Sequence, residues 1–318
     1  MASQTQFFTL LDNSGCRMAY RVSNPTSPTS RTPLFLINGL SAVMVDWTPL
    51  FEALGATRTL VISDHRGIGE STITDEWDQE LTLESMGLDV IHLAHHLGYN
   101  RIDLLGFSMG GHITQALLSS PQLAKVAEDG LVVIDDKVKI RKAVLTATMV
   151  KLPRGEVDMN KLNEQAEKIP DKKKRNGFIT EQMMKLQYHP AVLGTGKPLQ
   201  GQFEHRLQVA RTTKRPAWII GLQFLAIQSA DLRKQLHRIP SSVPVMVIHG
   251  KRDQMVLYSE SERILDGIKH AKRFEGTPSG EFGHFWYDYF DLHRVWIPSI
   301  NAFLDHGDVG VNRGESKL

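Results

Sequence analysis

Short, uninterrupted apolar runs alternate along the chain with longer stretches in which apolar residues recur at helical spacing. An uninterrupted apolar run is typical of a strand buried on both faces of a parallel sheet, whereas helical spacing is typical of a helix covering one face. Their alternation predicts an α/β fold, a mostly parallel, twisted sheet with helices on both faces. The predicted strands are residues 33–37, 59–62, 102–105, 143–148, 243–248 and 272–275, and the predicted helices are residues 46–54, 82–97, 257–268 and 287–304.

Two parts of the chain depart from this alternation. Residues 7–11 and 17–22 flank a polar, turn-forming segment, which predicts an N-terminal hairpin. Residues 151–238 are charged and helical in pattern, and they predict a helical cap inserted between two strands. The basic run at 172–175 is interpreted as a solvated turn between cap helices, rather than a nuclear signal or a phosphate site. The predicted division is a first core segment (1–150), the cap (151–238), a second core segment (239–305) and a flexible tail (306–318).

The sharpest local signal is the sequence Gly-Phe-Ser-Met-Gly at residues 106–110, which follows a predicted strand and leads into a helical pattern. A chain that reverses from strand to helix around Ser108 must hold this serine in a strained backbone conformation, with its hydroxyl clear of the chain. Gly106 and Gly110 flank the turn because a Cβ atom at either position would collide across it. The motif therefore predicts a nucleophile elbow at Ser108.

Two further residues fit a catalytic triad with Ser108. Asp253 follows the predicted strand 243–248, and His284 follows the last predicted strand, so the order along the chain is Ser, Asp, His. In open α/β sheets, ligands bind at the carboxyl ends of the strands, where these three residues are expected to meet. Ser108 would be the nucleophile, His284 the general base and acid, and Asp253 the residue that orients and stabilises the imidazole.

Hydrolysis by such a triad also requires two fixed hydrogen-bond donors for the tetrahedral oxyanion. The backbone N–H of Met109, directly after the nucleophile, is the first predicted donor. The second is the backbone N–H of Leu40, which follows the predicted strand 33–37 and Asn38-Gly39.

These motifs resemble those of the α/β-hydrolase superfamily, in particular its lipase and esterase branch with Gly-Phe-Ser-Met-Gly-Gly elbows. The loop at 64–71, the Gly-Lys-Arg-Asp at 250–253 and the Gly-His at 283–284 are similar to the corresponding loops of that family. One departure is Asn38-Gly39, where most relatives carry His-Gly. Ser108 also differs from the aspartate nucleophile of epoxide hydrolases and haloalkane dehalogenases.

Composition excludes several other classes. The chain has 318 residues, 41% of them apolar and 23% charged, with a net charge of +2, which gives no reason to expect nucleic acid as a partner. The single cysteine, Cys16, excludes an internal disulfide framework. No signal peptide or membrane-spanning segment is predicted. No nucleotide-binding glycine motif occurs, and His92, His95 and His96 lack an accompanying ligand set, so neither a cofactor nor a metal is expected.

The last three residues, Ser316, Lys317 and Leu318, match the tripeptide that the peroxisomal import receptor reads. They predict a peroxisomal location and a eukaryotic source. A capped core ending in this tripeptide is similar to fungal hydrolases of AK-toxin and AF-toxin biosynthesis. That resemblance implies an acyl substrate in a peroxisomal secondary-metabolite or fatty-acyl pathway.

The function expected from these features is hydrolysis of an ester or thioester with an apolar acyl group through an acyl-enzyme. Two alternatives keep the same fold. The triad could serve a C–C bond hydrolase or an acyltransferase, or the fold could be a non-catalytic receptor that binds a small molecule in its cap cleft.

Overall fold

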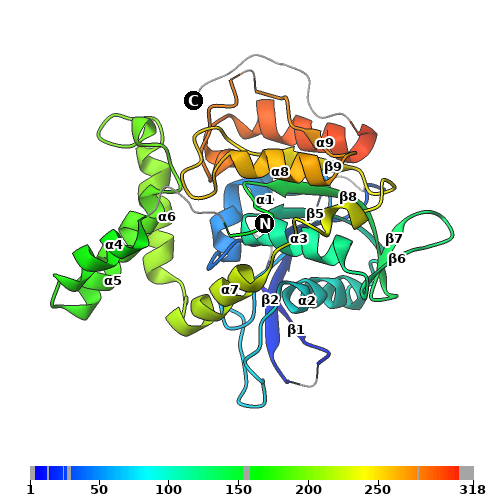
Figure 1. Cartoon of the computed structure of the whole chain (residues 1–318), viewed down its shortest axis with the longest axis horizontal. Coiled ribbons are helices and arrows are strands. Elements are labelled where there is room, and N and C mark those ends of the chain that lie inside the picture. Colours follow the sequence, from blue (N-terminus) through cyan, green and yellow to red (C-terminus); the bar gives the residue numbers. More distant parts are fainter. Residues whose placement is uncertain are drawn as a thin grey trace.

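The computed structural model describes residues 4–12, 14–23, 25–26, 30–152, 158–277 and 279–307. Within this part of the chain, one ten-stranded sheet forms the centre of the molecule (Figure 1). The strands are β1 (Gln6–Thr9), β2 (Arg17–Val22), β3 (Leu34–Ile37), β4 (Leu60–Ser63), β5 (Arg101–Phe107), β6 (Ala124–Val126), β7 (Val132–Ile134), β8 (Val138–Thr146), β9 (Val245–Ile248) and β10 (Lys272–Arg273).

The centre of the sheet is parallel. Strands β4, β3, β5, β8, β9 and β10 pair in this order, all in parallel. At one edge, β2 pairs antiparallel with β4, and β1 with β2. At the other side, the first half of β8 pairs with β7 and its second half with β9. The predicted parallel sheet and N-terminal hairpin are therefore confirmed.

Alternating side chains of the central strands belong to two separate hydrophobic clusters. Phe35 and Ile37 of β3 pack in one cluster, whereas Leu34 and Leu36 pack in the other. The first cluster includes side chains of α2, α3 and α8, and the second includes those of α1 and α9, so helices cover both faces of the sheet. These helices are α1 (Thr48–Gly55), α2 (Leu83–His96), α3 (Met109–Ser119), α8 (Ser259–Gly267) and α9 (Ile297–His306).

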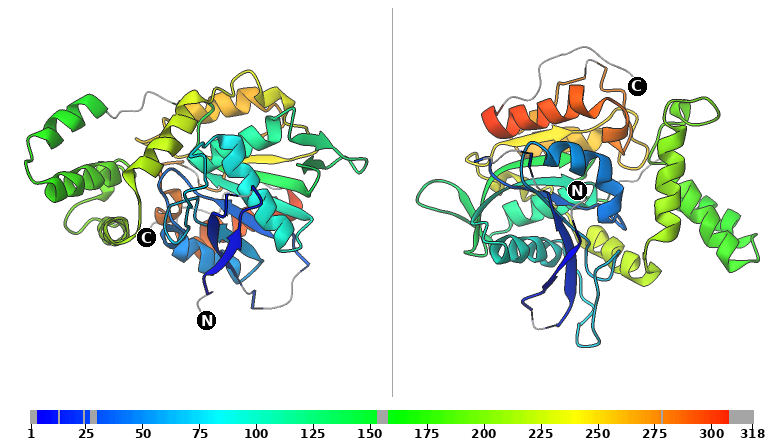
Figure 2. Two further views of the ribbon diagram at one scale, coloured as in Figure 1. Left: turned by 90° about the horizontal axis from the view of Figure 1, so that it is seen from below. Right: turned by 180° about the vertical axis from the view of Figure 1, so that it is seen from behind.

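The remaining helices lie between β8 and β9 in the sequence, in the segment 151–238 that we call the cap segment. Helices α4 and α5 stand away from the sheet on one side of the molecule, whereas α6 and α7 return to it (Figures 1 and 2). No helix among the described residues is long and apolar enough to cross a membrane. The helices are α4 (Met159–Glu167), α5 (Lys172–Lys185), α6 (Gln200–Thr212) and α7 (Ala217–Ser229).

Two predictions about local structure need correction, and one hairpin was not predicted. The basic run 172–175 is not a turn but the first turn of α5, whose N-cap Asp171 accepts a hydrogen bond from the backbone of Lys174. The last helix begins at Ile297, not near 287, because a turn at Trp286–Asp288 and a π-helical turn at Leu292–Trp296 precede it. The hairpin β6–β7 was not predicted, because its strands are only three residues long. The predicted tail signal, Ser316, Lys317 and Leu318, lies outside the described residues.

Candidate active site

Ser108 lies at the turn between β5 and α3, with φ of 54° and ψ of −118°. A positive φ is unfavourable for a residue with a side chain, and it is typical of strained functional turns. The backbone around the turn is fixed on both sides. The N–H of Ser108 donates to the carbonyl of Thr146 at 2.9 Å, and its carbonyl accepts from the Thr148 hydroxyl at 2.6 Å. The strained conformation is thus held by bonds from the last residue of β8 and from the loop that follows it.

Gly106 and Gly110 lie where the sheet and α3 approach each other at backbone distance. An added Cβ atom at Gly106 would come within 2.3 Å of the Gly110 carbonyl oxygen, and one at Gly110 within 1.9 Å of the Ile37 carbonyl oxygen. No side chain fits at these separations. The close approach brings the first turn of α3 against the end of β3.

Asp253 and His284 form a buried pair at the carboxyl end of the sheet. The Nδ1 atom of His284 lies 2.7 Å from Asp253 Oδ2. The other carboxylate oxygen, Oδ1, accepts from the backbone N–H groups of Met255 and Val256, both at 2.9 Å. These bonds fix the orientation of the carboxylate, and both side chains are almost completely shielded from solvent.

Electrostatics favour the ionised form of Asp253. Burial by itself would raise the pKa of this carboxyl, but attraction to His284 and hydrogen bonds from His249 and His284 outweigh it and lower the pKa to about 2. His249 Nε2 lies 3.4 Å from Asp253 Oδ2 and 2.9 Å from the Val256 carbonyl. His249 directly follows β9. It also supports the carboxylate, which no local pattern indicated.

A carboxylate accepts hydrogen bonds and cannot donate them, so the Nδ1 atom of His284 carries the proton in this pair. The neutral imidazole then has its lone pair at Nε2, as a general base requires. The ring of His284 lies 4.8 Å from the ring of Phe107, the residue directly before Ser108. Ser108 itself is 8% exposed. The elbow and the His–Asp pair therefore meet at one end of the sheet.

The two predicted oxyanion donors flank this point. Met109 is the first residue of α3, where backbone N–H groups point out of the helix and its dipole is positive. Leu40 follows β3 in a loop that approaches the elbow closely. The close approach is seen at Gly39, where an added Cβ atom would lie 3.2 Å from the Ser108 Cβ. Asn38, which replaces the usual histidine, donates from its side chain to the Ser63 carbonyl at 2.7 Å. It thereby ties the loop to β4.

The cap segment contacts two of the loops that build the site. The backbone N–H of His284 donates to the carbonyl of Gln187, between α5 and α6, at 3.1 Å. Gln223 of α7 accepts from the N–H of Ser41, and Arg215 before α7 donates to the Ser41 carbonyl. No sequence signal singled out these cap residues, because each acts through a contact with a residue far away in the chain.

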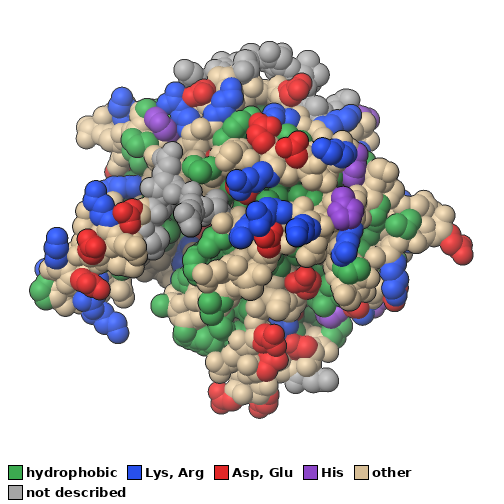
Figure 3. Space-filling model, viewed as in Figure 1, with side chains coloured by type: hydrophobic (Ala, Val, Ile, Leu, Met, Phe, Trp, Pro, Cys, Tyr) green, Lys and Arg blue, Asp and Glu red, His purple; other side chains and the backbone are tan. Residues whose placement is uncertain are grey.

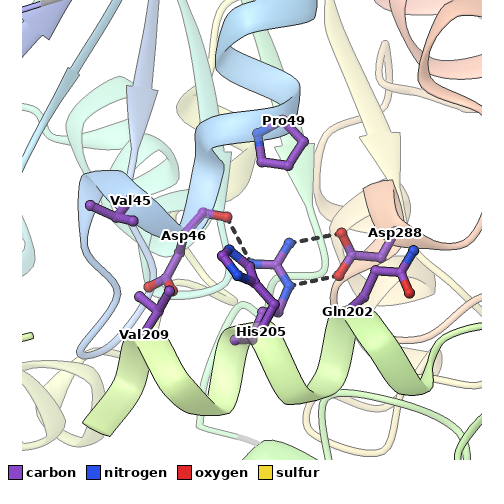
Figure 4. Close-up of a pocket in the computed structure, with 8 residues that line it drawn as sticks. Val45, Asp46, Pro49, Gln202, His205, Val209 and Asp288 are labelled. Carbon is purple, nitrogen blue, oxygen red and sulfur yellow. Dashed lines mark hydrogen bonds and ion pairs between the residues drawn. The ribbon is translucent and has the colours of Figure 1, made fainter. Parts of the chain in front are cut away.

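A buried ion pair also joins α6 to the segment after His284. Arg206 donates through Nε and Nη2 to the two oxygens of Asp288, at 2.6 and 2.8 Å, and through Nη1 to the carbonyl of Asp46, at 2.7 Å. Figure 4 shows α6 running past Asp46 and Asp288, beside a cavity of about 40 Å³. This cavity is large enough for a water molecule but not for an acyl chain.

Three other histidines make contacts that are typical of structural residues. His112 lies one turn after Ser108, fully buried, and its Nε2 contacts the Val150 carbonyl at 3.2 Å. His65 is buried against the Asn38 carbonyl. His92 lies 3.0 Å from Asp135. Among the described residues, no group of three or more histidine, cysteine, aspartate and glutamate side chains is placed to hold a metal ion.

Apolar side chains of α7 are divided between the core and the solvent. Ile219 is fully buried, and a Cβ atom at Gly67 would come within 2.9 Å of it. Trp218, Phe224 and Leu225 are 47%, 41% and 57% exposed, and hydrophobic side chains gather over this helix in Figure 3. The sequence pattern favours packing roles for Phe203, Trp218, Phe224 and Met183-Met184, with some of them lining an apolar acyl pocket as the alternative. Phe203 and Met184 are buried as expected, whereas the exposure of Trp218 and Phe224 contradicts a packing role for these two.

Comparison with known proteins supports the fold. Residues 32–288 match the family model of the α/β hydrolase fold, and the chain belongs to this family. Over 89 residues the chain is 35% identical to a protein of Caulobacter sp. (strain K31) named "Putative carbamate hydrolase RutD", covering 27% of this chain and 32% of that protein. The chain thus matches about a third of the length of that curated relative.

Solved structures are similar over a much larger part of the chain. A hydrolase from Pseudomonas aeruginosa PA01 superposes with a TM-score of 0.69 at 23% identity, covering 96% of this chain and 100% of that one. The esterase EaEST from Exiguobacterium antarcticum gives a TM-score of 0.68 at 19% identity, covering 95% and 99%. At these identities the similarity establishes the fold, and the fold alone does not define a substrate.

Proposed function

We propose that this protein is a serine hydrolase that cleaves an ester or thioester with an apolar acyl group. The observation that carries the proposal is the 2.7 Å contact between His284 Nδ1 and Asp253 Oδ2, located beside the strained turn that presents Ser108. A nucleophile, a base and an orienting acid at one end of the sheet are the components of acyl transfer to serine.

The proposed reaction has two halves. Ser108 Oγ attacks the acyl carbon and gives its proton to His284 Nε2, while Asp253 stabilises the imidazolium. The N–H groups of Met109 and Leu40 hold the resulting oxyanion. His284 then protonates the leaving alcohol or thiol, and an acyl-enzyme remains. A water molecule, deprotonated by His284, attacks this ester and releases the acid, and Ser108 regains its proton.

An apolar acyl group is favoured by the side chains around the site. The Phe107 ring lies 4.8 Å from the His284 ring and 5.6 Å from the Phe285 ring. Such surroundings exclude water and add little polar recognition. One similar structure is named an esterase and one relative a putative carbamate hydrolase, which is consistent with a hydrolase of this class.

A peroxisomal fatty-acyl or toxin pathway remains a prediction from the sequence Ser316, Lys317, Leu318 and from the resemblance to fungal hydrolases. It adds acyl-CoA thioesters to the substrates worth testing, beside simple aryl and alkyl esters.

The test is intact-mass measurement after treatment with a fluorophosphonate, which phosphonylates only an activated serine. We expect one adduct on the wild-type protein, none on Ser108→Ala, and one on Ser229→Ala, a matched change of an exposed serine on α7. An adduct on Ser108→Ala, or none on the folded wild-type protein, would contradict the proposal. The latter result would favour the receptor function. A panel of esters and thioesters of increasing chain length then defines the acyl preference.

A further inference from the structure

The loop that carries Leu40 is held by side chains of the cap segment, at Ser41. Ser41 has φ of 59°, a conformation that residues other than glycine rarely adopt. Both of its backbone polar groups are bound by cap side chains. Its N–H donates to Gln223 Oε1 at 2.9 Å, and its carbonyl accepts from Arg215 Nη1 at 2.8 Å.

Burial constrains the side chain of Gln223, and an ion pair constrains that of Arg215. Gln223 is fully buried in α7, and its amide orientation follows from the bond to Ser41, because only the oxygen of the amide can accept. Arg215 also bonds Asp46 through Nη2 at 3.0 Å. The carboxylate of Asp46 in turn accepts from the N–H of Val43 at 3.0 Å. The loop 41–46 is thus bound to the cap segment at both ends.

These bonds act on the peptide groups next to the proposed oxyanion donor. The N–H of Ser41 belongs to the peptide group that follows Leu40, so fixing it fixes the ψ angle of Leu40. The N–H of Leu40 lies one peptide group earlier, in the part of the loop where Gly39 approaches Ser108. An oxyanion donor contributes to catalysis only if it points at the position of the developing charge before the reaction starts.

We infer that Gln223 and Arg215 are positioning residues that hold the Leu40 N–H in place for the oxyanion, so that the oxyanion hole is complete only when α7 is docked on the core. This inference rests on the proposed serine hydrolase function. It assigns to the cap segment a part in stabilising the transition state, beyond enclosing the substrate.

The inference predicts a loss in kcat without a matching change in KM. Gln223→Leu and Arg215→Met each lower kcat for an aryl ester by about 10- to 100-fold, because a donor displaced by a fraction of an ångström stabilises the oxyanion less. The rate of phosphonylation of Ser108 falls in parallel, since the phosphonyl oxygen uses the same donors. KM stays close to that of the wild-type protein.

Further variants distinguish a positioning role of Gln223 and Arg215 from a general packing role. Arg215→Lys keeps a donor for the Ser41 carbonyl and retains more activity than Arg215→Met. The double variant of Gln223→Leu and Arg215→Met loses less than the product of the single losses, because both side chains act on one residue. Gln228→Leu and Arg211→Met change exposed residues of α7 and α6, and both keep wild-type kinetics.

The experiment measures kcat, KM, the phosphonylation rate and thermal unfolding for all of these variants. If Gln223→Leu does not fold, Gln223→Asn replaces it, since its amide is one methylene too short to reach Ser41. Wild-type phosphonylation and kcat in the folded variants, with Ser108→Ala inert, would overturn the inference and leave the proposed function intact. A parallel rise in KM with unchanged kcat would also overturn it. A wild-type protein that takes up no phosphonate would overturn both.

Discussion

The ion pair between Arg206 and Asp288 gives the clearest prediction about stability. Arg206→Met removes two hydrogen bonds to the Asp288 carboxylate and one to the Asp46 carbonyl. It also removes the guanidinium from its position 4.0 Å from the centre of the Phe285 ring. Asp288 stays buried, with the Tyr188 hydroxyl still donating to it at 2.6 Å. The variant therefore leaves a buried carboxylate without its counter-charge.

Breaking one side of such a buried pair costs about 3–5 kcal/mol in the free energy of unfolding. For a chain of this size, that corresponds to a decrease in melting temperature of roughly 4–8 °C. Much of the cost arises from the unpaired charge, so Asp288→Asn added to Arg206→Met should restore part of the stability, since the amide is neutral and its oxygen still accepts from Tyr188.

Urea unfolding followed by tryptophan fluorescence measures these differences. Arg211→Met is the matched control, because Arg211 lies on the same helix with its side chain 48% exposed. It should change stability by about 0.5 kcal/mol or less. The reasoning is refuted if Arg206→Met unfolds within about 1 kcal/mol of the wild-type protein, or if the double variant is as unstable as the single one.

Three other predictions test separate parts of the molecule. Gly110→Ala should abolish phosphonylation of Ser108, because its Cβ would lie 1.9 Å from the Ile37 carbonyl oxygen; a labelled, folded variant would contradict this. Burial lowers the pKa of His112 to about 4 from 6.5, so the unfolded chain binds the proton first and stability falls as the pH decreases from 6.5 to 4. His112→Gln should remove about 2 kcal/mol of this acid-dependent loss between pH 7 and 4.5, measured as urea midpoints at these two pH values, and an unchanged pH dependence would argue against it. A fluorescent protein ending in Ser316-Lys317-Leu318 should collect in peroxisomes, and the same fusion without the tripeptide should stay diffuse; an identical distribution of the two would disprove the address.

The sequence predicted the central strands because each is a short apolar run, and helix α2 because its apolar residues recur at helical spacing. The structure shows that Thr82 caps this helix by accepting from the Ser85 N–H. The sequence did not predict the late start of α9. The apolar and aromatic residues from Trp286 to Trp296 are compatible with helical spacing. A 3₁₀ turn at Trp286–Asp288 and a π-helical turn at Leu292–Trp296 arrange them around the core instead. Aromatic contacts such as that of Trp286 with Trp296, at 4.6 Å, are tertiary and leave no periodic signal.

Tertiary contacts also explain why the sequence predicted only part of the candidate site. Ser108, Asp253 and His284 each follow a strand or a motif that can be read locally, and this placed them at one edge of the sheet in advance. Gln223 and His249 have no such signal. Gln223 reaches Ser41 across 182 positions of sequence, and His249 contacts Asp253 only because the turn between them folds back. Residues that act by touching another residue become visible only in three dimensions.

The backbone contact at Gly110 has a consequence for redesign. Since main-chain atoms of β3 and α3 touch at this point, the spacing between the Ser108 turn and the loop at Gly39 is set by the scaffold and not by replaceable side chains. In a mutant library aimed at new acyl groups, substitutions in the elbow around Ser108 would therefore bring no benefit.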